Sequence, residues 1–253
     1  MDDGSTDNTE ELVMGYIHEE EIQIKYIKTQ NGGKQRAHNV GVSQCSCPVF
    51  VCVDSDDYLV PAAVACLLRE WELVKDDKSV SGLLFLKGRS ETESLGPRFP
   101  DGIERLTLRN LYGKYRFRGD TGLMYRTDLL RKFPFWVAPG EKFIGENYVY
   151  DQIDQHYSLK PINEILYVAE YLSDGYTKNI RKITKENPVG YLTLKKQSIS
   201  FGHTLYERYR DTVLYLVGCM LAKRRRGITE APVRTLAVLA YIPAKIVRHT
   251  LFR

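Results

Sequence analysis

The sequence predicts an α/β fold in which a mostly parallel sheet with flanking helices is followed by a C-terminal helical extension. Short apolar runs rich in β-branched and aromatic residues alternate with segments of helical periodicity, as in a doubly wound sheet. An acidic cluster, Asp54-Ser55-Asp56-Asp57, directly follows the apolar run 49–53, which is typical of the end of a buried, parallel strand. The 253 residues, 43% hydrophobic and 27% charged, suffice for one such domain with an appendage.

Local patterns predict the elements in order. Period-two alternation or continuous apolar runs predict strands over 22–26, 49–53, 80–86 and 122–125. Helical spacing and start signals predict helices beginning near Asp7, Gly33, Pro61 and Thr127. The segment 87–120 is rich in turn residues and is expected to hold a loop with a short helix near 106–112. Two further helices, including residues 213–222 and 236–242, are expected after residue 188.

The acidic cluster at 54–57 can hold a hard divalent cation. Three carboxylates at the carboxyl end of a strand suit Mn²⁺ or Mg²⁺, which can in turn hold a diphosphate. A turn or a helix N-cap is the structural alternative, because Asp and Ser favour both.

Three blocks occur in an ordered series: 1–9 (MDDGSTDNT), 31–41 (NGGKQRAHNVG) and 53–57 (VDSDD). Their order and spacing resemble the family-2 glycosyltransferases of GT-A fold, with an aspartate after strand two, a basic helix start and the DxD element. The resemblance extends less sharply to about Asn187. It implies a hexosyltransferase-type enzyme that transfers a sugar from a nucleoside-diphosphate donor, expected to be UDP-linked, with inversion and metal assistance, to a glycan or lipid-linked acceptor in cell-surface polysaccharide biosynthesis.

The resemblance also implies roles for the donor side of the site. Asp56 is the expected ligand of Mn²⁺ or Mg²⁺, Asp54 contacts the ribose or the sugar, and Asp57 supports either. Asp3 is expected beside the base, where a carboxylate can accept the imide N–H of uracil; a turn residue before Gly4 is the alternative. Lys34 is expected at the diphosphate, near a helix N-terminus; a solvated surface lysine is the alternative.

The catalytic base is expected within 145–154. Glu146 is our choice, because it stands at the turn where the family places its carboxylate, and Asp151 is the runner-up. On a helix these two side chains, five residues apart, do not point into one site. Many relatives carry Glu-Asp where this chain has Glu146-Asn147, and an asparagine cannot act as a base. A helix-start glutamate is the structural alternative for Glu146.

The chain resembles an N-terminally truncated member of the family. Only Met1 precedes Asp2-Asp3, whereas relatives have a strand, a helix and most of a second strand before this point. The expected domains are therefore 1–187, a GT-A domain lacking its first strand and helix, and 188–253, a basic helical extension. An alternative function is a catalytically incompetent remnant that binds nucleotide-sugar weakly or serves as a partner protein.

The tail combines apolar runs with basic residues, including Lys223-Arg224-Arg225-Arg226. An interfacial helix on anionic lipid and a helical pair packed on the domain with a solvated basic rim are equally compatible with this pattern. No apolar run is long enough to cross a bilayer, and five cysteines without a CxxC pair fit a reducing cytosol. We expect a cytoplasmic location, or a peripheral one at the inner face of the cell membrane. A nucleic-acid partner is not expected, because the net charge is only +4 and no recognised module is evident.

Overall fold

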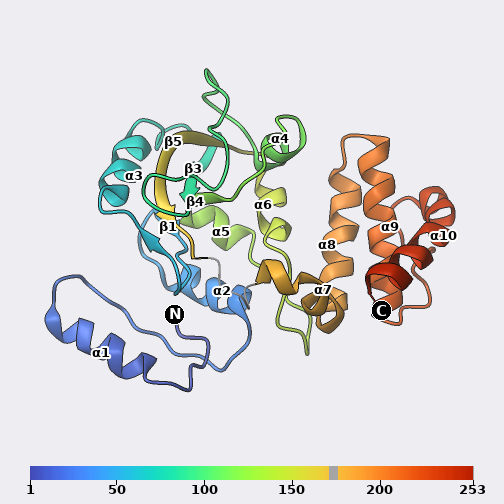
Figure 1. The fold of residues 1–253 in the computed structure, drawn as a ribbon, viewed down its shortest axis with the longest axis horizontal. Helices are drawn as coiled ribbons and strands as arrows, with labels where there is room; N and C mark the ends of the chain where they lie inside the picture. Colours follow the sequence, from blue (N-terminus) through green and yellow to red (C-terminus); the bar gives the residue numbers. More distant parts are fainter. Residues whose placement is uncertain (171–175, 253) are drawn as a thin grey trace. The chain divides into compact units, whose positions relative to one another are not determined.

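The computed structural model describes residues 1–170 and 176–252 (Figure 1). The chain divides into two compact units. The sheet unit consists of Cys45–Pro134 and Val149–Asn179. The terminal unit consists of Met1–Gln44, Phe135–Tyr148 and Ile180–Arg253.

The sheet unit contains a five-stranded mixed sheet with the strand order β1-β4-β3-β5-β2. Its strands are β1 (Val49–Val51), β2 (Tyr58–Leu59), β3 (Val80–Gly88), β4 (Thr121–Arg126) and β5 (Ser158–Val168). β3 and β5 pair in parallel, whereas β1·β4, β3·β4 and β2·β5 are antiparallel. The central strand β3 therefore has an antiparallel neighbour, β4, on one side and a parallel neighbour, β5, on the other. The acidic turn at 54–57 connects β1 to β2 in the chain.

The core of the sheet unit forms between β3 and helix α3 (Ala63–Glu72). Leu83 and Phe85 of β3 are fully buried, and Trp71 of α3 is 5% exposed. The Arg126 guanidinium lies over the Trp71 ring at 4.6 Å from its centre. Short helices α4 (Leu108–Gly113) and α5 (Thr127–Lys132) also lie in this unit, and α6 (Asn147–Ile153) begins at the end of the segment 135–148.

The terminal unit is helical. Its elements are α1 (Thr9–Glu19), α2 (Lys34–Gln44), most of α7 (Tyr176–Glu186), α8 (Pro188–Phe201), α9 (Leu205–Leu221) and α10 (Arg234–Leu251). α9 packs against both α8 and α10, and α8 and α9 run side by side in Figure 1. A capping box formed by Thr204 and Glu207 begins α9. None of the helices in the described residues is both long and apolar enough to span a bilayer.

The α/β class with flanking helices is confirmed, and most elements form where the sequence predicts them. The sheet nevertheless differs in detail, because β1 pairs antiparallel with β4 and is only half-buried. The prediction of a fully buried parallel strand at 49–53 was wrong. An apolar run indicates burial but does not specify the direction of the partner strand or the number of neighbours.

Two other sequence predictions also need correction. Residues 22–26 form no strand, and the pairing described nearby is a single parallel bridge between Asp2 and Lys28. β5, whose burial does not alternate regularly, was not predicted at all. The region after residue 188 is helical as expected, but it forms three helices rather than two. The proposed domain boundary at 187/188 stays a prediction.

Candidate functional site

In the terminal unit, the Asp3 carboxylate holds the loop that leads into α2. Its two oxygens accept hydrogen bonds from the backbone N–H groups of Gly32 at 2.8 Å and Gly33 at 2.7 Å. Gly33 has φ +95°, and a Cβ at this position would lie 1.9 Å from the Lys142 carbonyl oxygen. Only glycine fits this combination of conformation and close approach. The two N–H groups just before α2 are thus engaged by Asp3.

The neighbouring Asp2 is buried and structural. Its carboxylate accepts hydrogen bonds from the Tyr26 hydroxyl and from the Ser5 backbone N–H. These bonds, with Tyr26 contributing most, lower the pKa of Asp2 to about 2. Burial, together with the hydrogen bond to Asp2, raises the pKa of Tyr26 to about 12. Asp2 therefore stays ionised and fixes the backbone that presents Asp3.

Two of the predicted site residues meet in this unit. Lys34 is the first residue of α2, and Glu146 directly precedes α6. The Lys34 ammonium lies 3.0 Å from a Glu146 carboxylate oxygen, and the two side chains are 30% and 48% exposed. The expected diphosphate ligand and the expected base thus form an ion pair that solvent can reach.

Arg36 connects the glycine loop to the segment that carries Glu146. Its guanidinium donates to the carbonyl oxygens of Gly32 at 2.8 Å, Glu141 at 2.7 Å and Ala138 at 3.0 Å. No local sequence pattern pointed to a role for Arg36. An arginine in the first turn of a helix usually faces solvent, and two of the three carbonyl groups, those of Glu141 and Ala138, lie about a hundred residues away in the chain.

His38 is a second residue of this region to which no local sequence pattern pointed. It lies one helical turn after Lys34, and its ring packs edge-on against Phe135 with the ring centres 5.1 Å apart. Burial is the main reason why the pKa of His38 falls to about 4, although the Glu146 carboxylate opposes the shift. The imidazole is therefore neutral at neutral pH.

The segment that carries Glu146 is also joined to the C-terminal helices. The buried Glu141 carboxylate accepts hydrogen bonds from the backbone N–H groups of Val189 and Gly190, each at 2.7 Å, in the first turn of α8. Conversely, a side chain just before α8 binds the segment that carries Glu146: the Asn187 side-chain oxygen accepts hydrogen bonds from the backbone N–H groups of Lys142 and Phe143. The start of α8 and the residues just before Glu146 are thus fixed to each other.

In the sheet unit, Tyr167 of β5 fixes the acidic turn. Its hydroxyl donates to an Asp57 oxygen at 2.6 Å and accepts from the Asp54 N–H at 3.1 Å. The other Asp57 oxygen accepts from the Glu170 N–H at 2.9 Å. Asp57 therefore acts as a structural residue of the turn, while Asp56 is exposed and Asp54 is half-buried.

The carboxylates of this turn fit a hard divalent cation. Within the described residues there is no group of three or more His, Cys, Asp or Glu side chains placed to hold a metal ion. Mg²⁺ is usually held by one or two carboxylates together with substrate phosphates, rather than by a protein cage. Asp56 and Asp54 match that donor set, whereas both Asp57 oxygens already accept hydrogen bonds.

Asp151, the alternative base, lies in a different environment from Glu146. It is 5% exposed and lies 3.7 Å from the Arg109 guanidinium in the sheet unit. Nearby Asp154 accepts a hydrogen bond from the backbone N–H of Arg109, and burial raises the pKa of Asp154 to about 7. Tyr125 stacks on Tyr150 beside these carboxylates.

The fold matches solved crystal structures of a bacterial protein. The crystal structure of S. aureus TarS 1-349 matches with a TM-score of 0.50 and 16% identity, over 98% of this chain and 80% of that one. The crystal structure of S. aureus TarS matches with a TM-score of 0.51 and 16% identity, over 96% of this chain and 47% of that one. At this identity the likeness shows the fold alone, which is of the GT-A type.

The family follows from the sequence. The model of glycosyl transferase family 2 matches residues 1–133, which is more than half of the 253 residues. The chain belongs to this family, whose members transfer sugars from activated donors. No curated protein matches the sequence significantly.

Proposed function

We propose that the chain transfers a sugar from a UDP-sugar to a glycan or lipid-linked acceptor, with inversion and metal assistance, in cell-surface polysaccharide biosynthesis. The observation that carries this proposal is the Lys34–Glu146 ion pair, which brings together a cation for the donor diphosphate and a carboxylate for the acceptor hydroxyl. Family membership supports the reaction class.

On the donor side, we assign Asp3 to the nucleobase and Lys34 to the diphosphate. Asp3 already accepts two backbone N–H groups, but a carboxylate has about four lone-pair sites and can accept a third donor such as the uracil imide. Because Asp3 also engages the N–H groups of Gly32 and Gly33, the binding of the anion depends mainly on the Lys34 ammonium.

On the acceptor side, Glu146 is the proposed base. A donor diphosphate competes with Glu146 for Lys34, since both are anionic partners for one ammonium group. Exchange of Lys34 to the diphosphate frees the Glu146 carboxylate to take a proton from the acceptor hydroxyl. The Glu146 carboxylate is then available as a base only when the nucleotide-sugar donor is bound.

Asp56, with Asp54, would hold Mn²⁺ or Mg²⁺. A bound cation supplies Lewis-acid stabilisation of the negative charge that develops on the leaving diphosphate. Asp57 and Tyr167 keep the turn in place, so that Asp56 faces solvent in a fixed position.

A second candidate function is nucleotide-sugar binding without transfer. By the family resemblance Asn147 stands where many relatives have an aspartate, and an asparagine at this position favours a remnant of low activity. We therefore separate binding from turnover in the test.

The test begins with the thermal midpoint of the full chain in UDP and Mn²⁺, with and without chelator. A ligand at a hundred times its Kd stabilises the folded state by about 2.7 kcal/mol, which is a readily measured shift. We expect a chelator-sensitive rise in wild type that is lost in Asp56→Ala and kept in Asp101→Ala, an exposed aspartate of the same unit. No shift in a cooperatively folded wild type would contradict both candidates.

Turnover is then measured as UDP release from a panel of UDP-sugars. Release that requires Mn²⁺ and Asp56 supports the transferase. A metal-dependent thermal shift without release, for every donor and acceptor preparation tried, supports the binding function instead.

A further inference from the structure

Helix α10 buries one face against its neighbour. Ala237, Ala240 and Ala244 follow one another at helical spacing and are fully buried in the cluster with α9. These small side chains allow α10 to pack closely on α9, and they account for the helix's contribution to the core of the terminal unit.

The opposite face of α10 is apolar and exposed. Val238, Ile242 and Ile246, spaced by four residues, are 62%, 69% and 58% exposed, and Leu239 beside them is 67% exposed. Because residues four apart lie above one another on a helix, these side chains form one continuous stripe. We call Val238, Leu239, Ile242 and Ile246 the apolar stripe of α10.

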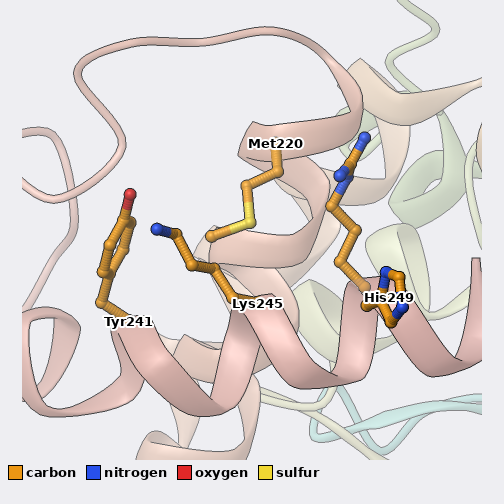
Figure 2. A pocket seen from close by; sticks show the side chains of 5 residues that line it. Met220, Tyr241, Lys245 and His249 are labelled. Atoms are coloured by element: carbon orange, nitrogen blue, oxygen red, sulfur yellow. The ribbon is translucent and has the colours of Figure 1, made fainter.

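A basic groove lies beside the apolar stripe, where α10 meets the end of α9. The groove has a volume of about 550 Å³ and is lined by Met220, Tyr241, Lys245, Arg248 and His249. Figure 2 shows the Lys245 side chain between Tyr241 and Met220, and its ammonium lies 4.8 Å from the centre of the Tyr241 ring. None of these five lining residues is acidic, and the sequence of α10 contains neither Asp nor Glu.

The same unit carries further positive charge. The exposed run Lys223–Arg226 follows α9, and exposed Arg234 begins α10. An apolar stripe edged by lysine and arginine on an otherwise packed helix matches the chemistry of an anionic bilayer, which offers hydrocarbon below a layer of phosphate groups.

We propose that the apolar stripe and the basic groove of α10 bind an anionic phospholipid membrane. The stripe enters the boundary between headgroups and acyl chains, while Lys245 and Arg248 bind lipid phosphate. A second copy fits this surface less well, because a two-fold contact would place identical basic edges against each other. A nucleic acid would leave the apolar stripe without a partner.

This inference deepens the proposed function, since a lipid-linked acceptor is presented at such a surface, but its test does not depend on transfer. The hydrogen bonds of the buried residues Glu141 and Asn187 join α8 to the segment carrying Glu146, and α8 packs on α9. Membrane contact through α10 would therefore attach that segment to the bilayer surface.

The experiment is co-sedimentation of the full chain with phosphatidylcholine vesicles, with and without phosphatidylglycerol. We expect binding only to the anionic vesicles and its loss at high salt, because exposed charges are then screened. Lys245→Gln with Arg248→Gln should weaken the partition coefficient about 25-fold, roughly fivefold for each basic residue. Ile242→Ser with Ile246→Ser should weaken it at least about tenfold.

Matched controls separate these effects from a general loss of charge or apolar surface. Ile22→Ser removes an isoleucine that is 70% exposed on another part of the chain, and Lys78→Gln removes an exposed lysine. Both should bind like wild type, and all variants should keep the wild-type thermal midpoint, because the changed side chains are exposed.

Three results would overturn the proposal. The first is equal binding to neutral and anionic vesicles. The second is equal binding by the wild type and both α10 double variants. The third is an absence of vesicle binding together with self-association of the chain that the Ile242→Ser, Ile246→Ser double variant abolishes. Failure here would leave the UDP and Mn²⁺ thermal shift unaffected, so the two proposals can fail separately.

Discussion

The Nζ atom of Lys34 lies 3.0 Å from Oε1 of Glu146, although the two residues are more than a hundred positions apart in the chain. Lys34 begins α2 and Glu146 directly precedes α6. The Gly33 loop before Lys34 and the Arg36 side chain after it are both bonded to, or in close contact with, the segment that carries Glu146. The ion pair is therefore set by the surrounding backbone rather than by two mobile side chains alone.

Glu146→Gln should lower UDP-sugar turnover by about 10²- to 10⁴-fold and leave the UDP-induced thermal shift in place, because a glutamine cannot accept the acceptor's proton. Turnover and thermal midpoint are measured on the same preparation. Asp151→Asn is the comparison, since Asp151 is buried against Arg109. It should lower stability, with a smaller effect on turnover per folded molecule. The reverse pattern would assign the base to Asp151.

Gly33→Ala should destabilise the chain by at least about 2 kcal/mol, because an alanine is strained at positive φ and its Cβ would overlap the Lys142 carbonyl oxygen. Urea unfolding measures the change. Gly140→Ala is the matched control, since Gly140 has φ +81° but open space around its Cβ position, and it should cost about 1 kcal/mol. Equal losses in the two variants would show that the close approach to Lys142 is unimportant.

Tyr167→Phe should cost about 1–3 kcal/mol, because Asp57 and the Asp54 N–H both lose a hydrogen-bond partner. The acidic turn should become less ordered, so the thermal shift caused by Mn²⁺ with UDP should shrink as well. Tyr58→Phe removes a hydroxyl from a half-exposed tyrosine on β2 and should change neither quantity. An unchanged metal-dependent shift in Tyr167→Phe would mean that the turn does not need this anchor.

The Asp154→Asn variant should be more stable than the wild type, and its advantage should be largest at alkaline pH. Burial raises the pKa of Asp154 from 3.8 to about 7 in the folded state, so the folded chain binds a proton more tightly than the unfolded chain. The contribution of this group to stability is therefore greatest below about pH 4 and is lost as the pH rises towards 7. The variant should exceed wild type by up to about 4 kcal/mol near pH 8, and by about 2 kcal/mol near pH 5.

Urea unfolding at the two pH values measures this difference. The asparagine can still accept the Arg109 N–H hydrogen bond, so the comparison isolates the cost of the charge. Asp101→Asn, at an exposed position, should show no difference between the two pH values. A wild-type advantage near pH 8 would mean that ionised Asp154 is stabilised by a partner.

The sequence by itself determined the family, the α/β class and most elements. Local spacing was sufficient to predict α2, α3, β3 and β4, because a helix or strand that buries one face leaves a periodic apolar pattern. The block 53–57 was sufficient to identify an acidic turn after β1. These features depend on neighbouring residues, which the sequence shows directly.

The tertiary structure alone decided how distant residues combine. In the folded chain β1 pairs antiparallel with β4, and the Tyr167 hydroxyl of the unpredicted strand β5 donates a hydrogen bond to Asp57. The Arg36 guanidinium donates hydrogen bonds to backbone carbonyl groups of the segment 135–148. Folding also brings Lys34 to Glu146 and leaves the apolar stripe of α10 exposed. Such pairings depend on which surfaces meet after the chain has folded, and a local pattern of apolar and charged residues carries no record of the partner.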